Sequence, residues 1–456
     1  MLKNKTAVDM TTGSILQRII TFAIPVFLGN LFQQLYNTAD SLIVGNFLGK
    51  EALAAVSSSG SLIFMLVGFF GGISVGAGVV ISRYFGAKND DQLRRAVHTA
   101  VAFGIAAGVL LTAIGVPLTR YMLQWMGTPE KVLPQSTLYF KIYFSGVIAS
   151  VMYNIAVGIL QAVGDSFHPL LYLIVSSCVN IALDLLFVGV FGFGVGSAAL
   201  ATIISQFISA VLAFTRLIRV KSPVQVHIRQ VRFNKGMLRE IISMGIPTGV
   251  QNSIIGFANV IVQSHINDFG EVGVAGCGAY FKIEGFAFLP ITCFAMALTT
   301  FISQNLGARQ YDRAKRGAKL GVLCSVSLAE VIGVLIFTLS PLLVKAFNRD
   351  PEVVSFGVRQ AHTEALFYCF LAFSHCIAGI MRGAGKAIVP MLVMMICWCA
   401  IRVSYITVIT KFVSNPVAVF WAYPITWTLS SAAFLFCFFK TDWIHGFEKK
   451  AAVSEF

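Results

Sequence analysis

The sequence predicts an all-α polytopic membrane protein, and three observations support this fold class. Of its 456 residues, 57% are hydrophobic and only 12% are charged, whereas soluble domains carry ~25% charged residues. Apolar runs long enough to cross a bilayer recur along the whole chain, and such runs are typical of membrane helices rather than of barrel strands. A segment of the first half also recurs in the second half.

The hydropathy pattern predicts twelve transmembrane helices. We expect them at residues 19–47, 52–82, 93–117, 136–163, 168–190, 196–218, 238–267, 273–303, 316–344, 358–381, 388–413 and 416–439. The longest polar interval follows the sixth span. We therefore assign residues 1–218 to an N-lobe, 219–235 to a cytoplasmic linker, and 236–456 to a C-lobe with a cytoplasmic tail.

The two halves are related by a duplication. The segment ISRYFGAKNDDQLRRA starting at residue 81 aligns with ISQNLGARQYDRAKRG starting at residue 302 (302 − 81 = 221). Gly164 and Gly385 repeat this offset (385 − 164 = 221), and Pro25 and Pro247 lie 222 apart (247 − 25 = 222). Six spans per copy give both copies one orientation, so we expect two six-helix lobes related by a pseudo-twofold axis along the membrane normal, with substrate passing between them.

The distribution of positive charge along the chain indicates how the helices are oriented in the membrane. The net charge is +14, and Lys and Arg fall mainly in alternate connections: the N-terminus, residues 83–95, 216–239, 309–319 and 382–386, and the tail from residue 440. This is the positive-inside pattern, which predicts a multi-pass protein of a prokaryotic plasma membrane with both termini in the cytoplasm. The basic excess therefore indicates contact with anionic membrane lipid and not with nucleic acid.

Motifs for other energy sources and for catalysis are missing from the sequence. There is no Gly-x-x-x-x-Gly-Lys-Ser/Thr loop for nucleotide binding. The nine cysteines form no paired framework, and the seven histidines are scattered without a His-x-x-x-His or His-Glu pair. We therefore expect no enzyme and no cofactor other than a bound Na⁺, and transport driven by an ion gradient.

The most informative stretch is residues 24–49, where Asp40 is the one ionisable residue of an apolar segment. A charge inside a membrane segment costs about 3 kcal/mol on insertion scales, so a buried partner, an ion or a proton is expected. The alternative is that Asp40 sits at a helix end and reaches water. Pro25 removes a backbone hydrogen bond and is a candidate hinge. Tyr36 and Gln33 lie beside Asp40, and an acid with an aromatic face favours flat organic cations.

The intramembrane acids Asp40 and Asp184 belong to the N-lobe and have no acidic equivalent in the C-lobe. In the repeat alignment Asp40 corresponds to Val262, and Asp184 corresponds to Tyr405. Asn180 shares one helical face with Asp184 because the two are four residues apart. These residues lie in the first, fourth, fifth and sixth predicted spans. We expect packing of these four helices to form a polar cluster of Asp40, Asn154, Asn180, Asp184 and Thr202, with Gln206 on the same helix face as Thr202.

This cluster has three interpretations. Oxygen ligands from Asp40, Asn180, Asp184 and Thr202 suit a hard cation such as Na⁺. Two nearby carboxylates in a dry site would also hold a proton between them. The third interpretation is polar contact between helices, in which amides and hydroxyls satisfy one another.

The C-lobe ionisable residues are less coherent. They are Lys282, Glu284, Glu330, His375 and Arg402. Lys282 and Glu284 are two residues apart and so point in different directions. Glu284 and His375 are candidates for proton relay or for binding cationic substrate, although a structural ion pair with Arg402 is equally compatible with the sequence. We place Glu330 near a lipid-facing helix end.

The segment NTADSLIVG at residues 37–45, the Gly-Ala-Lys and Gly-Ala-Arg turns at 86–88 and 307–309, and the six-plus-six repeat resemble the multidrug and toxic compound extrusion (MATE) family over essentially the whole chain. The resemblance is greatest to its DinF-like branch. It implies secondary antiport, in which H⁺ or Na⁺ enters as an amphipathic, often cationic compound leaves. The residues that match the N-lobe cluster of that branch are Asp40, Asn154, Asn180, Asp184 and Thr202, and Pro25 matches the proline linked to bending of the first helix.

Two departures from related proteins bear on this resemblance. The NorM-like branch relies on C-lobe acids, whereas residues 246–266 here contain Gln251 and Gln263 but no acid. A flippase for a lipid-linked precursor, the alternative function in the same superfamily, needs a cationic cleft for phosphate. Since Lys282 and Arg402 are the only predicted intramembrane cations, cationic cargo is favoured. One chain supplies both halves of the pathway, so we expect a monomer.

Overall fold

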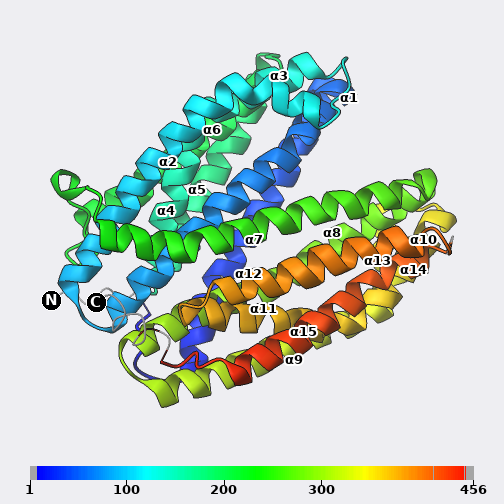
Figure 1. The fold of residues 1–456 in the computed structure, drawn as a ribbon. Helices are drawn as coiled ribbons and strands as arrows, with labels where there is room; N and C mark the ends of the chain where they lie inside the picture. Colours follow the sequence, from blue (N-terminus) through cyan, green and yellow to red (C-terminus); the bar gives the residue numbers. More distant parts are fainter. Residues whose placement is uncertain (1–7, 414, 446, 448–456) are drawn as a thin grey trace. The chain divides into compact units, whose positions relative to one another are not determined.

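The computed structural model describes residues 8–413, 415–445 and 447, and within them the side chains of residues 50, 51, 53, 54, 57–65 and 67 are left aside. In these residues the chain forms α-helices and short turns and no strand (Figure 1). The first half contains α1 (Ile15–Gly86), α2 (Asp90–Trp125), α3 (Leu133–Ser145), α4 (Val147–Ala162), α5 (Phe167–Asp184), the π-helix η1 (Leu185–Val190) and α6 (Val195–Arg219), followed by the 3₁₀-helix η2 (Ile228–Gln230). The second half contains α7 (Lys235–Asn267), α8 (Gly270–Gly307), α9 (Tyr311–Phe347), α10 (Pro351–Glu364), the 3₁₀-helix η3 (Ala365–Phe367), α11 (Tyr368–Gly383), α12 (Ile388–Met394), the π-helix η4 (Met395–Ile401), α13 (Arg402–Ile409), α14 (Pro416–Phe420) and α15 (Ala422–Lys440).

The predicted all-helical membrane fold is confirmed. Ten helices of the described chain are long and apolar enough to cross a membrane, or eleven when α3 and α4, bent by 49° to each other, count as one span. α7 is also long, with 33 residues, but its amides, Gln251 and Gln263 among them, make it more polar. Each of the twelve predicted spans therefore coincides with a helix or a bent helix pair. Gly49, with φ 83°, interrupts α1 between the first and second span.

The helices form two compact units. The described residues of the first unit are Val8 and Leu28–Gly249, and those of the second are Asp9–Phe27 and the described part of Val250–Phe456. The chain passes between units inside α1, two residues after Pro25, and inside α7, two residues after Pro247. The two passages fall at equivalent points of the predicted duplication. The division into lobes at residues 218 and 236 stays a prediction.

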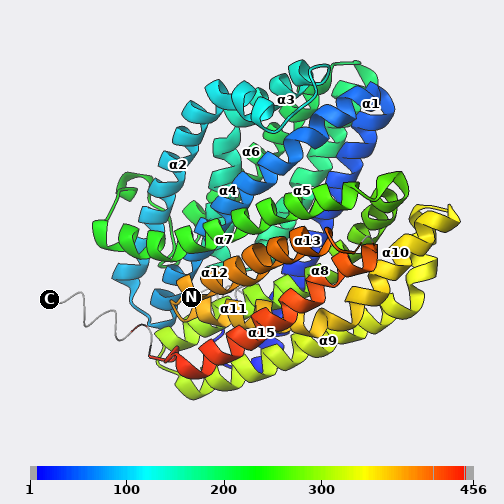
Figure 2. The ribbon, with the colours of Figure 1, turned by 45° about the vertical axis from the view of Figure 1, so that its right-hand side comes forward.

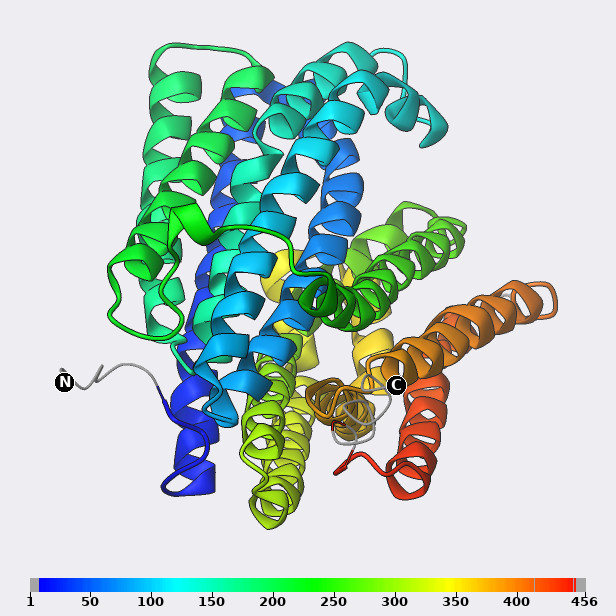
Figure 3. The same cartoon turned by 60° about the vertical axis from the view of Figure 1, so that its left-hand side comes forward.

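In the first unit, α2, α4, α5 and α6 run side by side (Figures 1 and 3). Phe140 and Phe144 of α3 pack with Leu123 of α2 and Val147 of α4 in a buried cluster. The predicted linker lies on α2, because the His227 N–H donates to His98 Nε2 at 3.0 Å.

Glycines determine where α1 and α7 cross within the first unit. Gly72 and Gly76 of α1 meet Gly249 and Gly245 of α7, and a Cβ at either α1 position would overlap the facing backbone. Each helix thus presents two glycines four residues apart, which is the small-residue spacing that permits close approach of membrane helices.

In the second unit, α8 packs against α9, α10 and α11, and α11 also packs against α15 (Figure 2). The segment before α1 joins this unit at the α8–α9 turn. Gln304 Oε1 accepts from the Met10 N–H at 3.1 Å, Asn305 Nδ2 donates to the Met10 carbonyl at 3.1 Å, and Arg313 Nη1 donates to the Gly13 carbonyl at 2.8 Å. Met10 and Gly13 are therefore attached to the second unit by specific hydrogen bonds.

Candidate functional site

Two carboxyls of the first unit face each other. Asp40 of α1 and Asp184, the last residue of α5, are close enough to interact electrostatically, and Asp184 is fully buried. Two ionised carboxylates at this proximity repel each other, and a shared proton or a bound cation removes that repulsion. One oxygen of Asp40 and both oxygens of Asp184 are buried without a hydrogen-bond partner among the described residues. The pair can therefore take up a proton or a cation.

Asn180 adds an amide to this pair. It lies one turn before Asp184 on α5, is fully buried, and has its side chain in range of the Asp184 carboxyl. Neither polar atom of its amide has a hydrogen-bond partner within the described structure. Asp40, Asn180 and Asp184 thus form one compact group of polar atoms, which we call the acid pair site.

Tyrosines surround the acid pair site. Tyr139 of α3 is buried and close enough to both carboxyls to interact electrostatically, and Tyr143 one turn later is also buried. Tyr36 of α1 lies near Tyr143, and its hydroxyl is in hydrogen-bonding range of the amides of Gln33 and Gln206. An acid lined by aromatic rings is an environment that binds organic cations.

Sequence reasoning missed Tyr139 and Tyr143. They lie in the predicted fourth span, where aromatic residues are also common on lipid-facing surfaces. Their spacing of four residues, equal to that of Tyr36 and Asp40, places both on one helix face. This spacing could have indicated that both tyrosines face the same interior partner.

The side chains of Asn154 and Thr202 donate hydrogen bonds to backbone carbonyls of their own helices. Asn154 Nδ2 donates to the Ser150 carbonyl at 2.8 Å, and Thr202 Oγ1 donates to the Ala198 carbonyl at 3.1 Å. Within the described part of the chain, no hydrogen bond joins either side chain to the acid pair. Pro25 does not break α1, whose single non-helical residue is Gly49.

A second buried group of charges lies in the second unit. Glu364 of α10 is fully buried and accepts from Gln360 Nε2 at 3.0 Å. Glu284 of α8 and Arg402 of α13 are each close enough to Glu364 to interact electrostatically. We call these three residues the Glu–Glu–Arg group.

Aromatic and hydroxyl groups complete its surroundings. The Arg402 guanidinium donates to Thr426 Oγ1 at 2.9 Å and lies 4.5 Å from the ring centroid of Tyr423 and 5.3 Å from that of Trp398. The hydroxyls of Tyr280 and Tyr368 lie 2.8 Å apart. The buried guanidinium of Arg402 is therefore in contact with aromatic rings and a hydroxyl, and the two carboxyls lie nearby.

The other C-lobe candidates contact aromatic rings, and His375 shares Trp398 with Arg402. His375 packs edge-on against Phe288 at 4.9 Å and against Trp398 at 5.3 Å, measured between ring centroids. Lys282 lies 5.6 Å from the ring centroid of Phe347. Sequence reasoning missed Glu364 because an acid near the start of a predicted span is usually interfacial. The regular spacing of Gln360, Glu364 and Tyr368 on one helix face would have indicated it.

The donor set of the acid pair site favours a hard cation over a transition metal. No group of three or more His, Cys, Asp or Glu in the described residues could hold a metal ion. The unpartnered atoms of Asp40 and Asp184 and one of those of Asn180 are oxygens, which is the ligand type that Na⁺ prefers. Asp40, Asn180 and Asp184 thus offer oxygens of this type, and the Thr202 hydroxyl, which donates its proton to the Ala198 carbonyl, keeps its lone pairs.

Comparison with known proteins identifies a family whose model matches each half of the chain. The MatE family matches the chain twice, over residues 25–186 and 247–408, and the second match starts 222 residues after the first (247 − 25 = 222). "Probable multidrug resistance protein YoeA" of Bacillus subtilis (strain 168) is 28% identical over 425 residues, which cover 91% of this chain and 92% of that protein.

Two solved structures are similar over nearly the whole chain at 21% identity, which supports a shared fold. One is described as "Outward-facing conformation of a multidrug resistance MATE family transporter of the MOP superfamily", with a TM-score of 0.88 and 99% coverage of both chains. The other is described as "Reverse polarity of binding pocket suggests different function of a MOP superfamily transporter from Pyrococcus furiosus Vc1 (DSM3638)", with a TM-score of 0.89 and coverage of 95% and 97%.

Proposed function

Because this chain belongs to the MatE family, we propose that it is a secondary active multidrug efflux transporter that exports amphipathic, often cationic organic compounds in exchange for H⁺ or Na⁺. A relative of nearly equal length is named as a probable multidrug resistance protein. The observation that carries the coupling proposal is the acid pair site, where Asp40 and Asp184 face each other with buried, unpartnered oxygens.

The proposed cycle uses the charge of this pair. With both carboxylates ionised, the N-lobe attracts a cationic compound, and Tyr36 offers its ring to the flat part of that compound. Uptake of H⁺ or Na⁺ then neutralises the pair, since two adjacent buried carboxylates strongly favour a bound proton or cation. Bending of α1 at Pro25 would follow and reduce the space available to the compound, so that it leaves outward.

The other candidate residues have supporting roles in this proposal. Gln33 and Gln206 are proposed to orient Tyr36, because their side-chain amides lie close to its hydroxyl. Glu284 and His375 are proposed to contact substrate from the C-lobe, and Asn154 and Thr202 to support the ion-binding helices. Both termini are proposed to lie in the cytoplasm of a prokaryotic cell, and the transporter to act as a monomer in contact with membrane lipid.

A flippase for a lipid-linked precursor is the second candidate. One solved structure of this fold is described as having a pocket of reverse polarity and a different function. The polarity of the site is therefore the property that distinguishes the two candidates. Here the buried first-unit site contains two acids and an amide, which disfavours a phosphate and supports cationic cargo.

The test is efflux of a fluorescent organic cation from proteoliposomes under an imposed pH gradient or an imposed Na⁺ gradient. We expect one gradient to drive efflux by the native protein, and Asp40→Asn and Asp184→Asn each to abolish that dependence. The double variant should lose no more than either single variant, because the two carboxyls act as one unit. Asp268→Asn is the matched control, since that side chain is 76% exposed and should leave efflux unchanged.

Three results would contradict the proposal. Efflux of the dye that neither gradient affects would remove coupling. Efflux that persists in both Asp variants would remove the acid pair site from the mechanism. Movement of a fluorescent anionic lipid between leaflets, without movement of the dye, would favour the flippase.

A further inference from the structure

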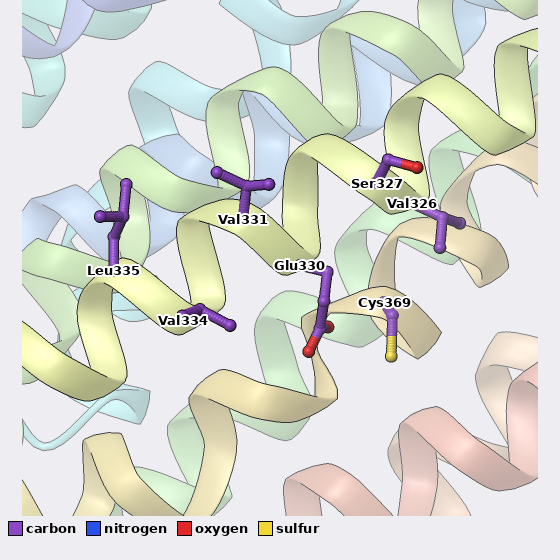
Figure 4. A pocket seen from close by; sticks show the side chains of 7 residues that line it. All are labelled: Val326, Ser327, Glu330, Val331, Val334, Leu335 and Cys369. Carbon is purple, nitrogen blue, oxygen red and sulfur yellow. The ribbon is translucent and has the colours of Figure 1, made fainter.

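A groove opens on the second unit, remote in sequence from the acid pair site. It has a volume of about 600 Å³ and is lined by Val326, Ser327, Glu330, Val331, Val334 and Leu335 of α9 and by Cys369 of α11 (Figure 4). This volume lies within the range of small-molecule sites, roughly 300–1,000 Å³. We call it the α9 groove.

Glu330 is the only charged residue of the α9 groove, and it lies near the middle of a membrane span. It stands 19 residues after Tyr311 and 17 before Phe347, the ends of α9 (330 − 311 = 19; 347 − 330 = 17). At ~1.5 Å per residue, each end of the helix is roughly 25–28 Å away. This position corrects the expectation that Glu330 sits near a helix end. Acids at such depth are costly and usually serve a function.

No counter-charge neutralises Glu330 within the described structure. None of the ion pairs between described residues includes it. Its Oε2 is buried and has no hydrogen-bond partner among the described residues, and the Cys369 thiol is the polar group that interacts with the carboxyl. A thiol is a weak donor and cannot replace a cation.

The rest of the α9 groove faces lipid. Val331, Val334 and Leu335 are 57%, 46% and 51% exposed. Exposed apolar side chains in the middle of a membrane helix contact acyl chains. Figure 4 shows the side chains of Glu330 and Cys369 extending in the same direction, with Val334 on that side of α9 and with Val331 and Leu335 on the other side of the ribbon. A ligand would therefore reach the groove from within the bilayer and not from water.

We propose that the α9 groove binds lipophilic ammonium compounds from the membrane, with the ammonium at Glu330 and the apolar body along Val331, Val334 and Leu335. Charge complementarity selects this ligand class, because one uncompensated carboxylate in an apolar groove attracts one cation and repels anionic lipid. Membrane-dissolved organic cations would thus have a binding site on the transporter besides the acid pair site. The proposal does not depend on export.

The test is equilibrium binding of dansyl-dodecyltrimethylammonium in nanodiscs of neutral phosphatidylcholine, with Asp40→Asn present in every full-length protein compared so that the acid pair site does not contribute. We expect Glu330→Gln to weaken this binding at least tenfold, and to leave binding of an uncharged dansyl-dodecanol probe unchanged. Glu352→Gln, an exposed acid at the start of α10, is the matched control and should have no effect. Val334→Trp, which fills the groove, should weaken binding of both probes.

Equal binding of the ammonium probe with and without Glu330→Gln would overturn the proposal, as would equal losses for charged and uncharged probes in that variant. Glu330→Gln should keep or raise the thermal stability, because it removes an unpaired charge from the membrane, so misfolding would not explain a loss. Asp40→Asn separates this proposal from the proposed function. It should abolish coupled efflux while leaving probe binding at the α9 groove intact.

Discussion

Lys88 and Arg309 adopt the same left-handed backbone conformation at equivalent points of the two repeats, with φ of 52° and 56°. They are the non-glycine residues of the described chain with positive φ. Each N–H donates to the carbonyl three residues earlier, of Phe85 or Leu306, at 3.1 Å. The duplication therefore extends to single hydrogen bonds at the turn that follows the second predicted span of each repeat, after α1 and after α8.

This conformation predicts a stabilising substitution. Arg309→Gly should raise the stability by about 1 kcal/mol, because glycine adopts positive φ without the strain that a Cβ brings. Lys88→Gly should act in the same direction. The measurement is the midpoint of thermal unfolding in detergent, followed by size-exclusion chromatography. Arg316→Gly, at an exposed position inside α9, should instead lower stability by about 1 kcal/mol. Destabilisation by all three would show that the turn conformation carries no strain.

The crossing of α1 and α7 predicts a position that tolerates no side chain. Gly245→Ala should lower stability by about 2 kcal/mol or more, since its Cβ would lie 2.9 Å from the Cα of Ile73 and both groups belong to backbones that cannot easily move apart. Gly278→Ala is the matched control, because no atom lies within 4 Å of a Cβ there and alanine favours the helix. A Gly245→Ala protein as stable as native would refute this account of the crossing.

Hydropathy and spacing were sufficient to predict the helices and the duplication, because each span must satisfy its own backbone in lipid. They could not indicate that the predicted span 136–163 bends by 49° between α3 and α4. The bend occurs at Gly146, where a Cβ would collide with Ile203 of α6, so the space available at this point depends on a neighbour far away in sequence. Tyr139 and Glu364 were missed for a related reason, since helix packing decides which face of a span meets which partner.

The Glu–Glu–Arg group predicts strong destabilisation when its cation is removed. Arg402→Met should cost about 3 kcal/mol, because the buried Glu364 and the half-buried Glu284 would remain without a positive charge nearby. Adding Glu364→Gln to Arg402→Met should recover part of the loss. The measurement is a double-mutant cycle on thermal stability. Additive effects of the two substitutions would show that the two residues do not interact.

Pro25→Ala separates stability from transport. Alanine restores the N–H that proline lacks and removes the clash of its ring inside α1, so the helix should become more stable and harder to bend. We therefore expect a higher midpoint of thermal unfolding together with slower efflux of the fluorescent cation, with binding of the cation retained. Pro341→Ala in α9 is a control for removing a helix proline as such, and it should leave efflux unaffected. If Pro25→Ala transports at the native rate, bending at this residue has no part in the cycle, and the acid pair site must release its compound without it.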